Sequence, residues 1–186
     1  MENIPSSLFC RHMREDDLET VMNWRMQPDI TRYMNSDPKL TLRGQKDWFA
    51  SIKNKRPFFY WIISSGGQDV GVVQIVDYSE KACEWGYYVA VKSARSVWLA
   101  ISLELSLYDF LFLNTQVERI YAKSFSENAS VVRLHDLCGC ETETVLKNHV
   151  QKNGQSYDVT VQYMSRQKWE SIRESMEYQH VEFEKD

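Results

Sequence analysis

Glycine and proline are scarce in this sequence, with 7 and 4 residues in a chain of 186. Collagen-like repeats and flexible linkers need more of both, and the chain contains no internal repeat or long run of like charge. Intrinsic disorder is also disfavoured, because 43% of the residues are hydrophobic and 13% are aromatic. The sequence therefore predicts one globular domain over residues 1–186, with a core at about 8–165 and a C-terminal helix at about 166–178.

A surplus of positive charge is missing too. The 22 Lys+Arg residues face 26 Asp+Glu residues, which gives a formal net charge of -4. A mildly acidic chain offers no overall field for nucleic acid or for an anionic membrane surface. We expect neither as a partner, so an anionic ligand must be held by local groups.

Cysteine is limited to four residues, and no basic stretch followed by an apolar run stands near Met1. This cysteine content does not make a disulfide scaffold, so we expect free thiols, no signal peptide and a cytoplasmic protein. The most apolar segment, residues 97–113, is interrupted by four polar side chains, Ser102, Glu104, Ser106 and Asp109. It predicts a buried helix rather than a span through a bilayer.

What the sequence does contain is a regular series of strand and helix patterns. β-branched and aromatic runs predict strands at about 8–13, 58–63, 70–76, 83–91, 119–125, 141–151 and 155–164. Helical spacing of apolar residues predicts helices at about 15–25, 41–53, 97–113, 128–137 and from 166. Gly66-Gly67 and Asn153-Gly154 predict hairpin turns. The order predicts an α/β (mixed α+β) fold, with a central mixed, mostly antiparallel sheet flanked by helices.

For two of these segments the sequence also predicts which residues are buried. The aromatic run at 58–61 is expected to lie in the core, because no basic residues are interleaved with it as in a base-stacking surface. The helix that begins at Asn128 is expected to stop at Gly139. Its buried side is predicted to consist of Val131, Val132, Leu134 and Leu137.

The order of elements from about Leu8 to Met164 resembles the GNAT superfamily of acyl-CoA-dependent N-acyltransferases. Within it, the stretches at 23–25, 85–89, 92–95 and 152–159 are similar to enzymes of pseudaminic acid biosynthesis. Those enzymes acetylate the 4-amino group of a UDP-linked 4-amino-4,6-dideoxy sugar. The resemblance implies acetyl-CoA as cosubstrate, a small-molecule nucleotide sugar as acceptor and direct acetyl transfer to its amino group. A homodimer is one assembly that it leaves open.

The resemblance also implies a cofactor site. The pyrophosphate loop is expected at Arg95, Ser96, Val97, Trp98, Leu99 and Ala100. The superfamily commonly has glycine where Ser96 and Trp98 stand, so the indole must point away from the pyrophosphate, or else it packs in the core and the loop binds nothing. Backbone groups near Val89 and Val91 are expected to bind the pantetheine where the strand at 85–91 separates from the strand at 119–125, and Asn128 belongs to the same set.

Catalytic groups follow from the same comparison. His135 stands where many members have a tyrosine that protonates the departing thiolate, and an imidazolium can do the same. The alternative is a surface histidine bonded to solvent. Lys123 stands where a glutamate is the candidate base, so Glu84 or water must substitute. Glu84 is otherwise an ordinary strand carboxylate.

The acceptor is expected at the first two helices and the segment between them. The resemblance places Arg25, Met34 and Gln45 near the nucleotide, and the guanidinium of Arg25 suits a diphosphate. Arg25 as a surface ion-pair partner is the alternative. His135, Cys138 and Cys140 could begin a zinc site, but only three ligands lie close and their spacing crosses a helix end, so no metal is expected.

Two other functions remain open at this point. One is acetylation of protein N-termini, as in the ribosomal-protein acetyltransferases that share the early Trp-Arg segment. The other is a GNAT-shaped binding protein that has lost CoA binding, motivated by Ser96, Trp98 and Lys123.

Overall fold

The structure is a computed structural model that describes residues 7–186. Its internal contacts divide these residues between two compact units. Unit 1 consists of residues 7–74, 87–94 and 182–186, and unit 2 of residues 75–86 and 95–181. Strands β3 and β4 each contribute residues to both units.

Unit 1 combines a mostly antiparallel group of strands with short helices. Its elements are β1 (Leu8–His12), the 3-10 turn η1 (Glu15–Asp17), α1 (Leu18–Arg25), α2 (Pro28–Thr31), α3 (Leu42–Ile52), β2 (Tyr60–Ser65), most of β3 (Gln68–Val76), the end of β4 (Ala82–Val89), the 3-10 turn η2 (Lys92–Ala94) and β8 (Glu182–Phe183). β1 pairs antiparallel with β2 and β2 with β3. β8 pairs parallel with β1.

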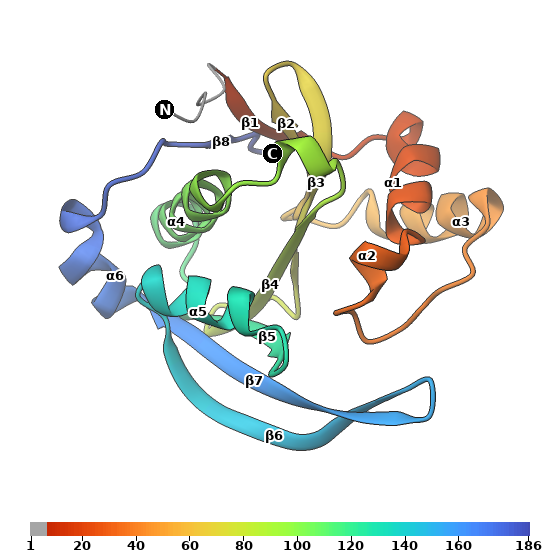
Figure 1. The fold of residues 1–186 in the computed structure, drawn as a ribbon. Coiled ribbons are helices and arrows are strands. Elements are labelled where there is room, and N and C mark those ends of the chain that lie inside the picture. The colour runs from red at the N-terminus through yellow and green to blue at the C-terminus, as the bar shows by residue number, and fades with distance from the viewer. Residues whose placement is uncertain (1–6) are drawn as a thin grey trace. The chain divides into compact units, whose positions relative to one another are not determined.

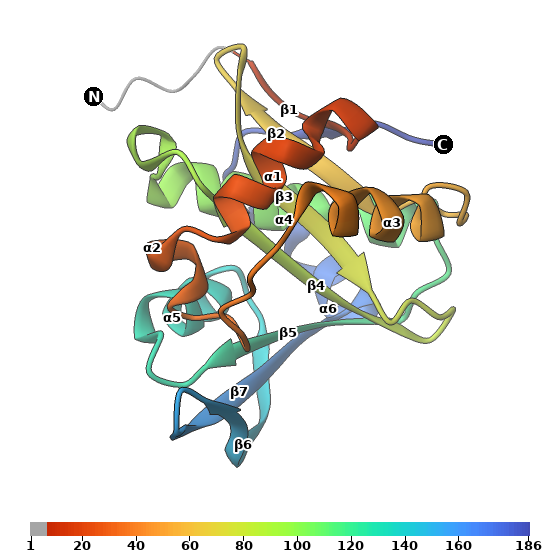
Figure 2. The same ribbon diagram turned by 90° about the vertical axis from the view of Figure 1, so that its right-hand side faces the viewer.

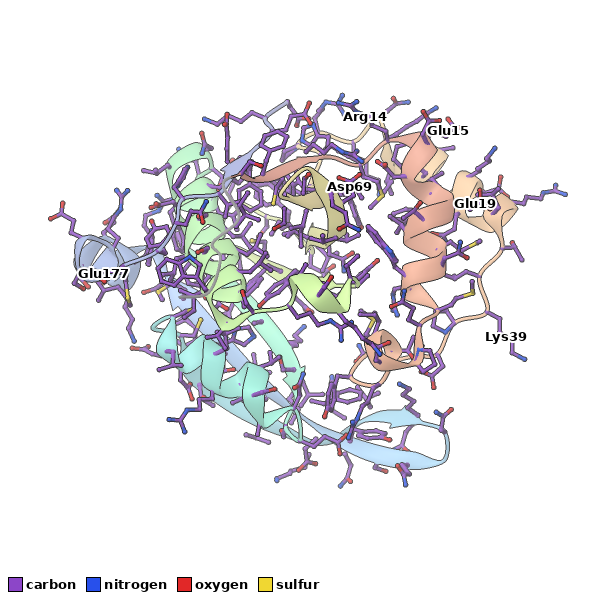
Figure 3. The ribbon with its side chains drawn as sticks, turned by 45° about the horizontal axis from the view of Figure 1, so that its top comes forward. Arg14, Glu15, Glu19, Lys39, Asp69 and Glu177 are labelled. Carbon is purple, nitrogen blue, oxygen red and sulfur yellow. The ribbon has the colours of Figure 1, made fainter. Side chains whose placement is uncertain are left out.

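Helices α1 and α3 lie side by side and cover this group of strands, as Figure 2 shows. Thr41 caps α3 by accepting a hydrogen bond from the Gly44 N–H. The apolar sides of both helices pack in one buried cluster with residues of the strands. The cluster includes Leu18 of α1, Phe49 of α3, Phe58 just before β2, Ile62 of β2 and Val72 of β3. Acidic side chains such as Glu15 and Glu19 point away from this core (Figure 3). Burial of one face therefore fixes the helices that were expected to carry the acceptor site.

Unit 2 is built around one long helix. Its elements are the first part of β4, α4 (Val97–Asn114), β5 (Arg119–Phe125), α5 (Ala129–Leu137), β6 (Glu141–Lys152), β7 (Gln155–Ser165), α6 (Arg166–Ile172) and the 3-10 turn η3 (Arg173–Ser175). β4 runs parallel to β5, and β5–β7 and β7–β6 are antiparallel. Figure 1 shows β6 and β7 as a long curved hairpin with α5 beside it.

Helix α4 is long and apolar enough to cross a membrane by length and composition alone. However, 61% of this segment is buried inside the protein, which is typical of a core helix. Its polar residues Ser102, Glu104, Ser106 and Asp109 are all buried as well. The helix is therefore the central core element of unit 2, as its interrupted apolar pattern predicts.

Several predictions from the sequence are confirmed. β5 has the expected bounds, and Asn153 and Gly154 form the turn of the β6–β7 hairpin with φ of 51° and 75°. Gly139 follows α5 with a φ of 89°, which is the left-handed stop expected there. All four cysteines are free and buried. In the aromatic run, Phe58, Phe59 and Trp61 are core residues.

Other expectations are wrong. α2 and β8 were not predicted, and the last helix ends at Ile172 with a 3-10 turn to Ser175, short of the expected 178. On α5 the prediction put Leu137 inside, but Leu137 is 59% exposed, whereas His135 is only 4% exposed. The alternative of a surface histidine is therefore excluded. The physical reason is a buried carboxylate on α4, described below.

Candidate functional site

The pairing of β4 with β5 is short. It joins Ala82–Glu84 to Arg119–Tyr121, after which β5 continues to Phe125 with β7 as its antiparallel partner. Just beyond the last pair, the Lys123 Nζ donates to a Glu84 carboxylate oxygen at 2.6 Å. Glu84 and Lys123 therefore form an ion pair, with 26% and 43% of their side chains exposed. Lys123 occupies the position at which the family resemblance implies a base. It is ion-paired with Glu84, the carboxylate expected to act as the base instead.

His135 and Glu84 lie on opposite faces of β4. Successive side chains of a strand point to opposite sides, and Trp85 follows Glu84 directly. The Trp85 ring is buried and meets the His135 ring edge to face, with 5.1 Å between ring centroids. The two predicted catalytic residues are thus not in contact with each other. Instead, each is held beside the point of β4 where its pairing with β5 ends.

A network of buried polar groups surrounds His135. Its Nδ1 lies 3.0 and 2.9 Å from the two carboxylate oxygens of Glu104, which is 0% exposed. Tyr108, one turn further along α4, donates its hydroxyl to the same carboxylate, and the Cys138 thiol also hydrogen-bonds to it. The Cys140 sulfur lies 3.0 Å from the Tyr108 oxygen. Glu104 therefore draws His135 inward, because a buried carboxylate needs hydrogen-bond donors.

The Tyr108 hydroxyl and the thiols of Cys138 and Cys140 in this network stay protonated. Burial, followed by the Glu104 charge, raises the pKa of Tyr108 well above its ordinary value. The same two causes raise the pKa of Cys140 to about 12 and raise that of Cys138 further still. Neither thiol is therefore a nucleophile near neutral pH, because the thiolate is the reactive form. The hydroxyl and both thiols act as hydrogen-bond donors.

The expected pyrophosphate loop forms the start of α4. Ser96 is the N-cap, and its hydroxyl accepts from the Leu99 N–H at 3.0 Å. The Ala100 N–H donates to the Ser96 carbonyl, while Arg95 and Val97 are exposed. Trp98 is only partly buried and is not a core residue. Its Nε1 is nevertheless shielded from solvent and has no hydrogen-bond partner among residues 7–186.

These features fit an anionic cosubstrate such as the diphosphate of acetyl-CoA. The first turn of a helix offers backbone N–H groups and the positive end of the helix dipole. The unpaired Trp98 N–H adds a side-chain donor at the same turn. Asn128 lies elsewhere in unit 2, at the N-terminus of α5, where its Oδ1 accepts from Ser130 rather than capping the helix.

The backbone groups of Val91, which were expected to bind the pantetheine, are already hydrogen-bonded within the protein. The Val91 N–H donates to the Val70 carbonyl at 3.2 Å, and its own carbonyl accepts from the Ala94 N–H at 3.1 Å. Both backbone groups of Val91 thus hold β3, β4 and η2 together within unit 1. A donor to pantetheine at Val91 is therefore not available without breaking this pairing, which narrows the expected backbone site to the neighbourhood of Val89.

The expected acceptor residues come from three segments of unit 1. Arg25 ends α1, Met34 follows α2, and Gln45 lies in α3; Met34 and Gln45 are partly buried. Burial lowers the pKa of Arg25, while Tyr88 and Asp37 act to raise it. The Arg25 Nη1 is shielded from solvent and has no hydrogen-bond partner among the described residues.

Glu104 is not among the site residues that the sequence predicts. Its only signal in the sequence is that of a carboxylate within the most apolar segment of the chain. No group of three or more His, Cys, Asp or Glu residues within residues 7–186 could hold a metal ion. The arrangement offers a proton-transfer group on one face of β4, an ion pair on the other and anion donors at the start of α4.

Known proteins support an acyltransferase fold. The sequence profile of the acetyltransferase (GNAT) domain matches residues 7–141. The SPbeta prophage-derived uncharacterized N-acetyltransferase YokL of Bacillus subtilis is 26% identical over 167 residues, which cover 88% of this chain and 93% of that protein. Acetyltransferase PseH of Campylobacter jejuni is 25% identical over 126 residues, covering 66% and 76%.

Solved structures show the same fold. The spermidine N-acetyltransferase from Vibrio cholerae, in complex with CoA and spermine, matches with a TM-score of 0.82. The match covers 88% of this chain and 98% of that one at 19% identity.

Proposed function

Because the chain belongs to the acetyltransferase (GNAT) domain family, we propose that it transfers the acetyl group of acetyl-CoA directly to an amino group of a nucleotide-linked amino sugar. The family makes the chain an N-acetyltransferase with acetyl-CoA as cosubstrate. The proposal concerns the acceptor and the roles of single residues. A cytoplasmic location belongs to it as well, since four free cysteines suit a reducing compartment.

The main support for a nucleotide-linked acceptor is the Nη1 of Arg25, which is buried and has no hydrogen-bond partner among the described residues. A desolvated guanidinium N–H without a partner is costly, and a diphosphate of the acceptor would satisfy it with a charge-assisted hydrogen bond. Met34 and Gln45 complete the proposed nucleotide site from the same unit. The relative PseH and the short stretches that resemble amino-sugar acetyltransferases support the same choice.

The reaction needs two proton movements. The new C–N bond forms as the thioester C–S bond breaks, so the amine loses one proton and the sulfur gains one. Acetyl-CoA supplies the activated acetyl group. His135 delivers the proton to the sulfur, and it lies on the α5 side of β4. Glu84 or water on the other face takes the amine proton; the Lys123 ion pair makes Glu84 the less effective of the two.

The loop at the start of α4 holds the diphosphate of acetyl-CoA in this proposal. Val97 and Trp98 supply N–H groups in the first turn, Trp98 adds its indole N–H, and Arg95 adds charge. Isothermal titration with acetyl-CoA tests this directly. The absence of heat at millimolar concentration would favour a binding protein without a CoA site.

The substitution Arg25→Ala tests the acceptor. We expect the KM for a UDP-linked amino sugar to rise by about tenfold or more, because a charge-assisted hydrogen bond contributes about 1.5–3 kcal/mol. The affinity for acetyl-CoA should stay within about twofold. Arg43→Ala is the matched control, since Arg43 is an exposed arginine on α3 of the same unit.

A panel of UDP-amino sugars and N-terminal peptides, assayed with the unaltered protein, separates the two acceptor classes. Acetylation of peptides alone would replace the proposal by N-terminal acetylation. A KM for the sugar that does not change in Arg25→Ala would remove Arg25 from the site.

A further inference from the structure

Helix α4 carries two deeply buried carboxylates, and they have different partners. Asp109 is 5% exposed and bonds to Trp169 and Tyr178, with Arg173 at 3.1 Å. Those contacts tie α4 to α6 and the segment that follows, which is a structural role. Glu104 is 0% exposed and faces His135 instead.

Glu104 is held as a pure acceptor. The Tyr108 hydroxyl, the Cys138 thiol and His135 Nδ1 all meet its carboxylate, and each of the three can donate. The ionised carboxylate, which has acceptor sites alone, accepts from all three of them. A buried charge is expensive unless it is paired, and the imidazole is the one group here that can become a cation.

This arrangement fixes the histidine. Nδ1 lies within 3.0 Å of two carboxylate oxygens, so with Glu104 ionised Nδ1 donates to them and carries a proton whether the ring is neutral or charged. The edge-to-face contact with Trp85 sets the plane of the ring. Nε2 is then the nitrogen that is left to exchange a proton.

We propose that Glu104 is a positioning residue that holds His135 protonated at Nδ1 and stabilises its imidazolium form, so that Nε2 delivers the proton to the CoA sulfur. The inference rests on the proposed function, in which His135 protonates that sulfur. Tyr108 and Cys138 hold the carboxylate in place from α4 and α5. In this proposal Glu104, which is 0% exposed, acts only through His135.

The test compares four variants with the unaltered protein. Glu104→Gln keeps the size of the side chain but turns one acceptor oxygen into a donor, so the charge that stabilises the imidazolium is lost. Asp109→Asn makes the same change at the structural carboxylate five positions along the helix. His135→Gln removes the proposed acid, and the fourth variant combines it with Glu104→Gln.

Turnover is followed as release of the free CoA thiol, with an amine acceptor and with water alone. We expect Glu104→Gln to lower kcat by about 100-fold, the lower end of general acid catalysis, with the KM for acetyl-CoA within about twofold. Asp109→Asn should lower Tm but keep kcat within about threefold. The double variant should be no slower than His135→Gln, because Glu104 acts through His135.

Two kinetic results would overturn the inference. One is a folded Glu104→Gln variant with kcat within about threefold of the unaltered protein. The other is a double variant that loses the product of the two single losses. If no amine is used by any protein, the acceptor assignment fails, while thiol release with water still decides the role of Glu104.

A spectroscopic check needs no variant at position 104 to fold. Histidine-labelled protein gives 15N shifts for each ring, and the His135→Gln spectrum assigns His135. In the neutral ring the proton must be on Nδ1. A neutral ring protonated at Nε2 in the unaltered protein would contradict the proposal outright.

Discussion

Gly86 has room beside it that no other group in the described residues fills. It follows Trp85 on β4, two positions beyond the last pair with β5. A Cβ added there would meet no atom within 4 Å. Gly71 is the opposite case, since a Cβ there would lie 2.1 Å from the Tyr88 carbonyl oxygen. One glycine is thus required by packing, and the other leaves space next to the proposed catalytic residues.

Gly86→Ala should separate binding from folding. We expect Tm to stay constant or rise slightly, because an alanine restricts the unfolded chain and meets no neighbour here. If the pantetheine runs beside β4, as the family resemblance implies, the added methyl group should weaken acetyl-CoA binding by about fivefold or more. Calorimetric titration gives the affinity.

Gly71→Ala is the control and should lower Tm, since its Cβ would strike the backbone. Unchanged acetyl-CoA affinity in Gly86→Ala would place the ligand away from this part of β4.

The ends of elements also carry stability. Gly139 closes α5 at a φ of 89°, and a Cβ there would lie 2.6 Å from Ile172 Cδ1 and 3.3 Å from Met164 Cε. Gly154 closes the β6–β7 turn at a φ of 75°, with nothing within 4 Å of its Cβ position. The two glycines share a left-handed backbone but differ in their surroundings.

Gly139→Ala should therefore cost more than Gly154→Ala. Each loses about 1–2 kcal/mol through its left-handed conformation, and only Gly139→Ala must also displace Ile172. Urea denaturation of the two variants gives the difference in unfolding free energy. Equal losses would mean that the end of Ile172 moves aside without cost.

Local sequence patterns predict individual helices, strands and turns well, but they predict poorly which distant residues these elements contact. The alternation of β5 and the Asn153-Gly154 turn are encoded within a few residues, so the sequence alone identifies them. The inward position of His135 depends on Glu104, 31 residues away, and the apolar pattern of α5 points to Leu137 instead. The catalytic candidate was identified from its family position, but its carboxylate partner could be found only in the structure.

At the scale of the whole molecule, unit 1 takes in the far end of the chain. β8 pairs with β1. Next to it, the Glu184 N–H donates to the Cys10 carbonyl, and the Glu184 carboxylate accepts from the His12 N–H. The Trp61 indole N–H donates to the Glu184 carbonyl. A two-residue strand has no sequence signal of its own, which is why β8 was missed.

Phe183 is the apolar anchor of this C-terminal segment. It is 4% exposed and meets the fully buried Trp61 edge to face at 5.3 Å. Phe183→Ala should lower the free energy of unfolding by about 3 kcal/mol, the lower end for a buried phenylalanine, because the cavity cannot close over a rigid indole. Glu182→Ala, at the exposed neighbour, should change it by less than about 0.5 kcal/mol.

Hydrogen exchange measures which strands are destabilised by Phe183→Ala. If the segment completes the core of unit 1, exchange in Phe183→Ala should accelerate at the amides of β1 and β2, since both strands depend on the contacts that Phe183 anchors. Faster exchange limited to residues 182–186 would mean that unit 1 is already complete without them. In that case the C-terminal segment only covers β1, and its removal should leave Arg25 and the proposed acceptor site of unit 1 undisturbed.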